Sequence, residues 1–210
     1  MNIVPSPWLA QFAAQRGLKY EPDVDERWIR VWEPYATLKV PFRYEHGLSA
    51  TGAIGSLTIA RFVVTFEAQN PAAPGTIERE ASSWIVIVQD VRLKGRVAVS
   101  SDRGSPFGEP QDLVSVPRRT TGDAAFDAVF ASFSPSAAEM GDALTPSLRK
   151  LLLGWRLPVH VEVRPGGFIL APVSLGADPA GLSWLMDAIH IFGEKASKRA
   201  AGTAGPSSAR

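Results

Sequence analysis

The sequence places one pair of proton-transfer groups on a single face of a predicted helix. Asp187 and His190 lie three residues apart in an apolar C-terminal segment, so a helix brings them one turn apart on its polar stripe. A carboxylate in that position orients an imidazole for general acid or base catalysis. The same stripe also suits a docked helix that exposes one seam to water. No nucleophile is specified beside the pair, which favours the solvated seam.

The chain's other two histidines indicate structural rather than chemical roles. His46 precedes Gly47 in a predicted turn, and His160 alternates with valines in a strand that we expect to be half-exposed. The three histidines show no metal-ligand spacing, and the chain has no cysteine. We therefore expect no metal, no cofactor and no disulfide.

Aromatic side chains supply the best candidates for ligand binding. Trp28 and Trp32 share one parity of a predicted strand over residues 28–32, and Tyr35 follows closely. Together they are candidates for lining a ligand groove. The other four tryptophans fall at positions that predict core packing: Trp8, Trp84, Trp155 and Trp184.

Four helix starts share one local signal, a small oxygen-bearing side chain followed by proline. The first residue can accept a hydrogen bond from a free backbone N–H, and proline at the first helical position has no N–H to leave unpaired. The pairs are Ser6 and Pro7, Ser134 and Pro135, Thr145 and Pro146, and Asp178 and Pro179. They predict an N-terminal helix, a middle helical pair and a C-terminal packing helix.

Strands are predicted between these helices. Residues 57–67 and 84–91 are apolar at both parities, which is typical of central strands covered on both faces. Residues 159–164 alternate valine with polar side chains and turn into 168–170, which predicts a hairpin with one wet face. Shorter candidates are 28–32, 40–44, 97–100 and 126–133. Because strands follow strands without crossover helices, the fold class is α+β with a mostly antiparallel sheet.

Composition excludes several classes of protein. Apolar residues form 45% of the chain and the net charge is +1, so neither disorder nor a nucleic-acid partner is expected. No stretch is long and apolar enough to span a bilayer, and the N-terminus lacks the features of a secretory signal. We expect one cytoplasmic domain over residues 1–199 and a disordered tail over 200–210, whose small residues cannot form a core.

Residues 91–195 carry several features in an order that resembles a bacterial domain family of unknown function. The shared features are Leu93 to Arg96 at a turn, a strand beginning at Phe126, Leu144, Thr145 and Pro146 opening a leucine-rich helix, and a hairpin over 159–171. The resemblance implies a topology, and it brings no activity or functional residues with it.

These observations favour a non-catalytic binding or interaction module for a protein partner or a small apolar ligand. The alternative is a small enzyme that uses Asp187 and His190 as an acid/base pair. That alternative requires a concave pocket with His190 at its wall. Ligand identity and oligomeric state stay open at this point.

Overall fold

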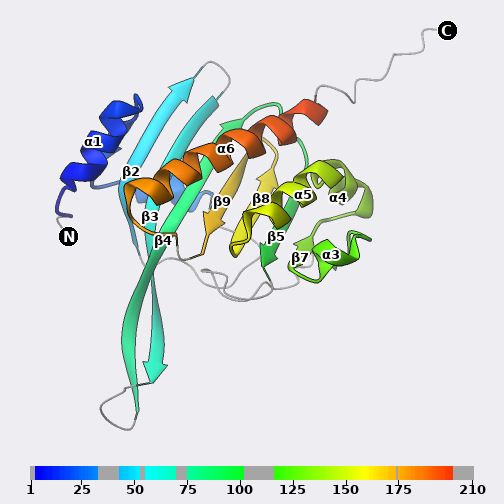
Figure 1. Cartoon of the computed structure of the whole chain (residues 1–210), viewed down its shortest axis with the longest axis horizontal. Coiled ribbons are helices and arrows are strands. Elements are labelled where there is room, and N and C mark those ends of the chain that lie inside the picture. The colour runs from blue at the N-terminus through cyan, green and yellow to red at the C-terminus, as the bar shows by residue number, and fades with distance from the viewer. Residues whose placement is uncertain are drawn as a thin grey trace.

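One antiparallel sheet organises the chain. The computed structural model describes residues 3–32, 43–52, 55–69, 75–101, 116–173 and 175–200, and in these residues a nine-stranded sheet carries helices on both faces (Figure 1). The elements in chain order are α1 (Pro7–Gln15), β1 (Lys19–Glu21), α2 (Glu26–Arg30), β2 (Arg43–Gly52), β3 (Gly55–Gln69), β4 (Thr76–Asp90), β5 (Val97–Ser101), β6 (Arg118–Arg119), α3 (Ala124–Asp127), β7 (Phe130–Phe133), α4 (Ala137–Ala143), α5 (Pro146–Trp155), β8 (Val159–Arg164), β9 (Gly167–Pro172) and α6 (Pro179–Ala200).

The strand order is β1-β2-β3-β4-β9-β8-β5-β7-β6, and each neighbouring pair is antiparallel. The β8 and β9 hairpin lies between β4 and β5, which are consecutive strands in the chain. The predicted α+β class is confirmed, with the N-terminal helix, the middle pair and the C-terminal helix all present.

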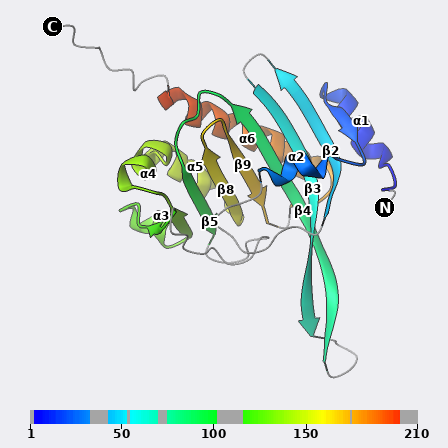
Figure 2. The same cartoon turned by 180° about the vertical axis from the view of Figure 1, so that it is seen from behind.

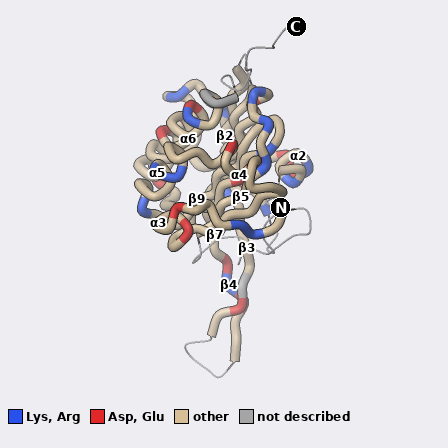
Figure 3. The backbone as a smooth tube through the Cα atoms, turned by 90° about the vertical axis from the view of Figure 1, so that its right-hand side faces the viewer, with Lys and Arg blue, Asp and Glu red and all other residues tan. Residues whose placement is uncertain are grey.

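The two faces of the sheet are covered differently. Helices α1, α4, α5 and α6 cover what we call the helix face, and α2 lies on the opposite, far face (Figures 2 and 3). The larger core fills the helix face and includes Phe12, Trp84, Leu148 and Leu185. A smaller core with Ile29, Tyr44, Phe62, Ile85 and Ile169 lies under α2. In the described part of the chain, none of the helices has the length and apolar content needed to cross a bilayer.

The helix-start signal is accurate for three of the four helices. The hydroxyl of Thr145 accepts a hydrogen bond from the Leu148 amide at 3.3 Å, and α1 and α6 begin at Pro7 and Pro179 as predicted. The fourth start, at Ser134, was placed two residues too early. Helix α4 is capped by Ser136, whereas the buried hydroxyl of Ser134 donates to the Arg96 carbonyl.

The strand predicted over residues 28–32 is wrong, because residues 28–30 lie in α2 and residues 31–32 form the turn that follows it. The Asp25 carboxylate accepts from the Arg27 amide at 3.1 Å and caps the helix, and Glu26 pairs with Arg30 one turn later at 2.8 Å. These local charges outweigh the β propensity of the aromatic residues.

The strand predicted over 126–133 is correct only in its second half. An Asp123 cap on the Phe126 amide, at 3.2 Å, starts the short helix α3 before β7 begins. Residues 40–42 of the predicted strand 40–44 lie outside the described residues, as do residues 201–210 of the predicted tail. The domain boundary at residue 199 stays a prediction.

The β8 and β9 hairpin has no wet face, contrary to the prediction. His160 and Glu162 are both 0% exposed, because the far face of the sheet is covered at this position as well. The predicted turn is present, with Gly166 at a φ of 90°. Position 167 requires glycine, because a Cβ there would collide with the Val88 carbonyl and would lie 2.8 Å from the Trp32 ring.

Strands β3 and β4 continue well past their neighbours. They pair from Gly55 with Asp90 to Gln69 with Thr76, whereas β2 follows β3 only as far as Val63. Residues 64–69 and 76–81 therefore form a two-stranded ribbon that projects from the body of the molecule (Figures 1 and 3).

The ribbon contains a repulsive cross-strand pair. Glu67 lies directly opposite Glu78, and like charges in that position destabilise an antiparallel pair. Replacing Glu78 by lysine converts repulsion into attraction. We expect Glu78→Lys to slow amide hydrogen exchange in the ribbon by up to about fivefold.

Glu80 provides the control, because it already has a cationic partner. Its carboxylate accepts from both terminal nitrogens of Arg43, at 2.8 and 3.0 Å. Glu80→Lys should therefore speed exchange in the same amides. Equal effects of the two substitutions would contradict the assignment of repulsion to Glu67 and Glu78.

Candidate ligand groove

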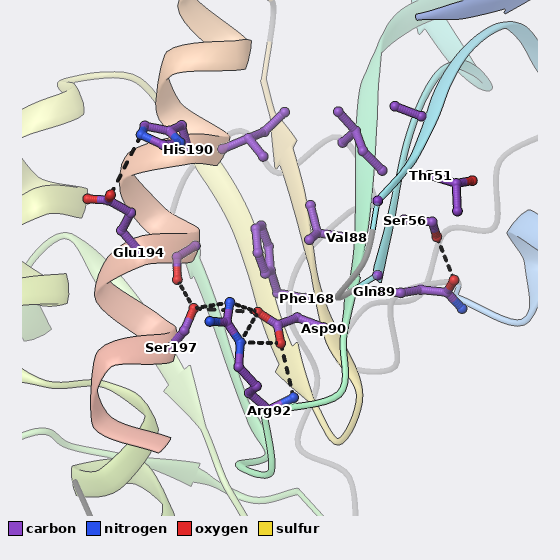
Figure 4. Close-up of a pocket in the computed structure, with 16 residues that line it drawn as sticks. Thr51, Ser56, Val88, Gln89, Asp90, Arg92, Phe168, His190, Glu194 and Ser197 are labelled. Atoms are coloured by element: carbon purple, nitrogen blue, oxygen red, sulfur yellow. Dashed lines mark hydrogen bonds and ion pairs between the residues drawn. The ribbon is translucent and has the colours of Figure 1, made fainter. Parts of the chain in front are cut away.

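A groove of about 730 Å³ opens on the helix face between α6 and the ends of β2, β3 and β4. Figure 4 shows α6 on one side and the ends of β2 and β3 on the other. The lining comes from residues 50–52, 55–57, 88–90 and 92, from Phe168, and from Ile189, His190, Gly193, Glu194 and Ser197 of α6. We call this space the groove.

The floor of the groove is a straight row of apolar side chains across four strands. Ala50 pairs with Leu57, Leu57 with Val88, and Val88 with Phe168, so all four project from the same face of the sheet. Three strand spacings of about 4.8 Å make this row about 14 Å long. We call these four residues the apolar row. Its elongated shape suits an extended chain better than a compact ring.

Helix α6 covers one end of the apolar row, where Phe168 is 1% exposed, and leaves Ala50, Leu57 and Val88 half-buried. A Cβ on Gly193 would lie 3.7 Å from the ring of Phe168, which is ordinary van der Waals contact. Phe192 and Ile189 pack on either side of this position, and the Phe192 and Phe168 ring centroids are 4.9 Å apart. The missing side chain at 193 therefore leaves room beside Phe168 in the wall of the groove.

One end of the groove is closed by a polar cluster that joins the sheet to α6. The guanidinium of Arg92 donates to Asp90 through Nε at 2.8 Å and through Nη2 at 2.6 Å, and Nη2 also reaches the Ser197 hydroxyl at 3.2 Å. These contacts are drawn in Figure 4. The hydrogen bonds from Arg92 lower the pKa of the Asp90 carboxyl despite its burial. Asp90 is therefore ionised at neutral pH, and its charge is matched by Arg92.

Of the predicted pair Asp187 and His190, only His190 lines the groove. His190 lines the groove, with its Nε2 3.7 Å from a carboxylate oxygen of Glu194. Asp187 is exposed on α6 and does not line the groove. The predicted acid/base role of Asp187 and His190 stays a hypothesis, and Glu194 is a partner that the sequence reasoning missed.

The aromatic candidates lie elsewhere. Trp28 is in α2 and Trp32 follows it, and both pack half-buried against the far-face core. The sheet separates them from the groove. Tyr35 lies outside the described residues. Their role in ligand binding stays a prediction. Trp28 and Trp32 do not share a strand, because Trp28 lies in a helix.

His46 is a structural residue of a β-bulge. It has a φ of 55°, and the pairing of β2 with β3 shifts by one residue between Glu45 and Leu48. Its Nδ1 lies 2.9 Å from the Tyr20 hydroxyl. Burial lowers the pKa of His46, which keeps the ring neutral at neutral pH.

His160 belongs to a buried ionic cluster on the far face. Its Nε2 lies 2.8 Å from Oε1 of Glu162, and Nε of Arg164 donates to Oε2 of the same carboxylate at 3.0 Å. Burial opposes the charged form of Glu162, but these two partners outweigh it and lower its pKa. The alternating pattern of β8 suggested a wet face, so this cluster was missed.

The described residues contain no group of three or more histidine, cysteine or acidic side chains placed to hold a metal ion. His46, His160 and His190 lie in different parts of the fold.

No family model matches this chain, and no curated protein does. One solved structure is similar in fold. It is the crystal structure of the mycobacterial trehalose monomycolate transport factor A, TtfA, with a TM-score of 0.55 and 10% sequence identity. The match covers 89% of this chain and 90% of TtfA. At this identity the likeness concerns the fold alone.

Proposed function

We propose that this chain is a non-catalytic binding module whose ligand occupies the groove. The apolar row carries this proposal, because α6 packs along the sheet yet leaves Ala50, Leu57 and Val88 of the row only half-buried in the groove. A volume of about 730 Å³ lies within the usual range for small-molecule sites. A concave site with a largely apolar lining and a few polar groups is the usual form of a small-molecule binding site.

The polar groups of the groove support binding rather than catalysis. The Ser56 hydroxyl donates to Gln89 at 2.5 Å, and the Ser197 hydroxyl donates to the Gly193 carbonyl. Neither hydroxyl is held by a histidine, as an activated nucleophile would be. The name of the similar structure, a transport factor, agrees with a carrier or adaptor role.

The alternative, an enzyme that uses Asp187 and His190, is favoured by one observation. His190 lies at the wall of a concave site, which is the position that a general base requires. Turnover that is lost in both His190→Ala and Asp187→Asn would establish this alternative and would displace the binding proposal.

The binding proposal is tested by filling the groove. Gly193→Leu places an apolar side chain over the floor without burying a polar group, and we expect it to reduce binding of the neutral apolar dye Nile red at least about tenfold. Gly154→Leu is the matched control, because Gly154 lies in α5 with open space around its Cα. Equal dye binding by both variants and the original chain would overturn the proposal. Native mass spectrometry of the purified protein would also report any ligand retained from the cell.

A further inference from the structure

We infer that the groove takes a single-chain lipid with an uncharged, oxygen-bearing head, of the monoacylglycerol class. The acyl chain lies along the apolar row and the head meets Arg92. This inference rests on the proposed function and adds the chemical class of the ligand to it.

The shape of the floor specifies one linear chain. The apolar row crosses β2, β3, β4 and β9 in a single file, and its half-buried part from Ala50 to Val88 is about 10 Å long. Its walls are the paired ends of β2 and β3 and the helix α6 (Figure 4). An extended acyl chain matches that length and width, whereas a second chain has no parallel row to occupy.

Arg92 offers the head a hydrogen-bond donor with little net charge. Its Nε and Nη2 are directed to Asp90 and Ser197. Among the described residues, none accepts a hydrogen bond from its Nη1, and the side chain is 48% exposed at the end of the groove. An ester carbonyl or hydroxyl oxygen at that position accepts from Nη1.

The charges of the lining disfavour an anionic head. Arg92 is the cation at this end of the lining, and the Asp90 carboxylate lies directly beside it. Asp90 already compensates Arg92 at 2.6 Å, so a carboxylate or phosphate head gains little attraction there. An uncharged head gains the hydrogen bond without the repulsion.

Decanoylglycerol and decanoate are the test ligands, because they share one acyl chain and differ in head charge. Calorimetric titration of the original chain at neutral pH should show decanoylglycerol binding at least about tenfold more tightly than decanoate. Arg92→Lys keeps the cation beside Asp90 but lacks the planar fork, so it should reduce this preference. Gly193→Leu should weaken both ligands, and Gly154→Leu should change neither.

The outcomes separate this inference from the proposed function. If decanoate binds as tightly as decanoylglycerol and Gly193→Leu blocks both, the neutral head is refuted and the groove survives as a binding site. Stronger binding of lysophosphatidylcholine than of decanoylglycerol also refutes the neutral head. If none of the three lipids and no Nile red binds in the groove, both proposals fail. The comparison of lipids needs only the original chain, so a poorly folded variant does not prevent the decision.

Discussion

Glu162→Ala is expected to destabilise the fold by about 3 to 5 kcal/mol, because it removes the central residue of a buried ionic cluster. Glu162 is 0% exposed and binds both His160 and Arg164 through its two oxygens. Removing the carboxylate takes the Glu162 anion away from the partly buried Arg164 and from the buried His160, and it leaves a cavity in the sheet. Chemical denaturation of the purified variant measures the loss.

Glu80→Ala is the matched control for this experiment. Glu80 also binds an arginine through two oxygens, but its side chain is 51% exposed at the root of the ribbon. Water replaces an exposed partner readily, so the free energy of unfolding should change little. A Glu162→Ala protein as stable as the Glu80→Ala protein would show that the far face is wet at β8.

The same cluster predicts a dependence of stability on acid. Because the folded-state pKa of Glu162 is lowered from its usual value of 4.5, its ionised form stabilises the fold above that pH. The contribution is lost as the pH falls through the folded-state pKa. Glu162→Gln should therefore be less stable than the original chain at neutral pH and approach it in acid. A constant difference across that range would contradict the lowered pKa.

Local signals in the sequence predicted the elements whose determinants are local. The cap of Thr145 on the Leu148 amide depends on four consecutive residues, so the start of α5 could be derived without tertiary information. The strand prediction at 28–32 was wrong, although the determinants of that segment are local as well. The Asp25 cap favours a helix there, whereas the aromatic side chains favour a strand. The strand prediction depended on the aromatic side chains alone.

Long-range packing determined what the sequence reasoning missed. Alternation in β8 indicates which side chains share a face but does not indicate whether that face meets water, so His160 and Glu162 were predicted to be exposed. The groove depends on the register of four strands, which brings Ala50 beside Leu57 and Val88 beside Phe168. Glycines inside the apolar helix α6, Gly181 and Gly193, are signals of close approach in the sequence, but they do not show which element comes close.

The second large effect on stability is expected from a substitution in α6, because this helix has one buried side and one exposed side. Leu185 is 0% exposed in the helix-face core, whereas the His190 side chain is 76% exposed at the wall of the groove. Leu185→Ala removes apolar contacts and leaves a cavity that the packed sheet cannot close, so we expect a loss of about 2 to 5 kcal/mol.

His190→Ala changes an exposed side chain whose nearest ionic partner is 3.7 Å away, so its cost should stay under about 0.5 kcal/mol. Both variants are compared with the original chain by thermal and chemical denaturation, and His190→Ala is also titrated with Nile red. A binding module predicts that His190→Ala keeps its stability and most of its dye binding, because the apolar row supplies the contact area. A strongly destabilised His190→Ala protein would instead mean that α6 buries its polar stripe, and the groove would then be an internal site in which His190 has a chemical role.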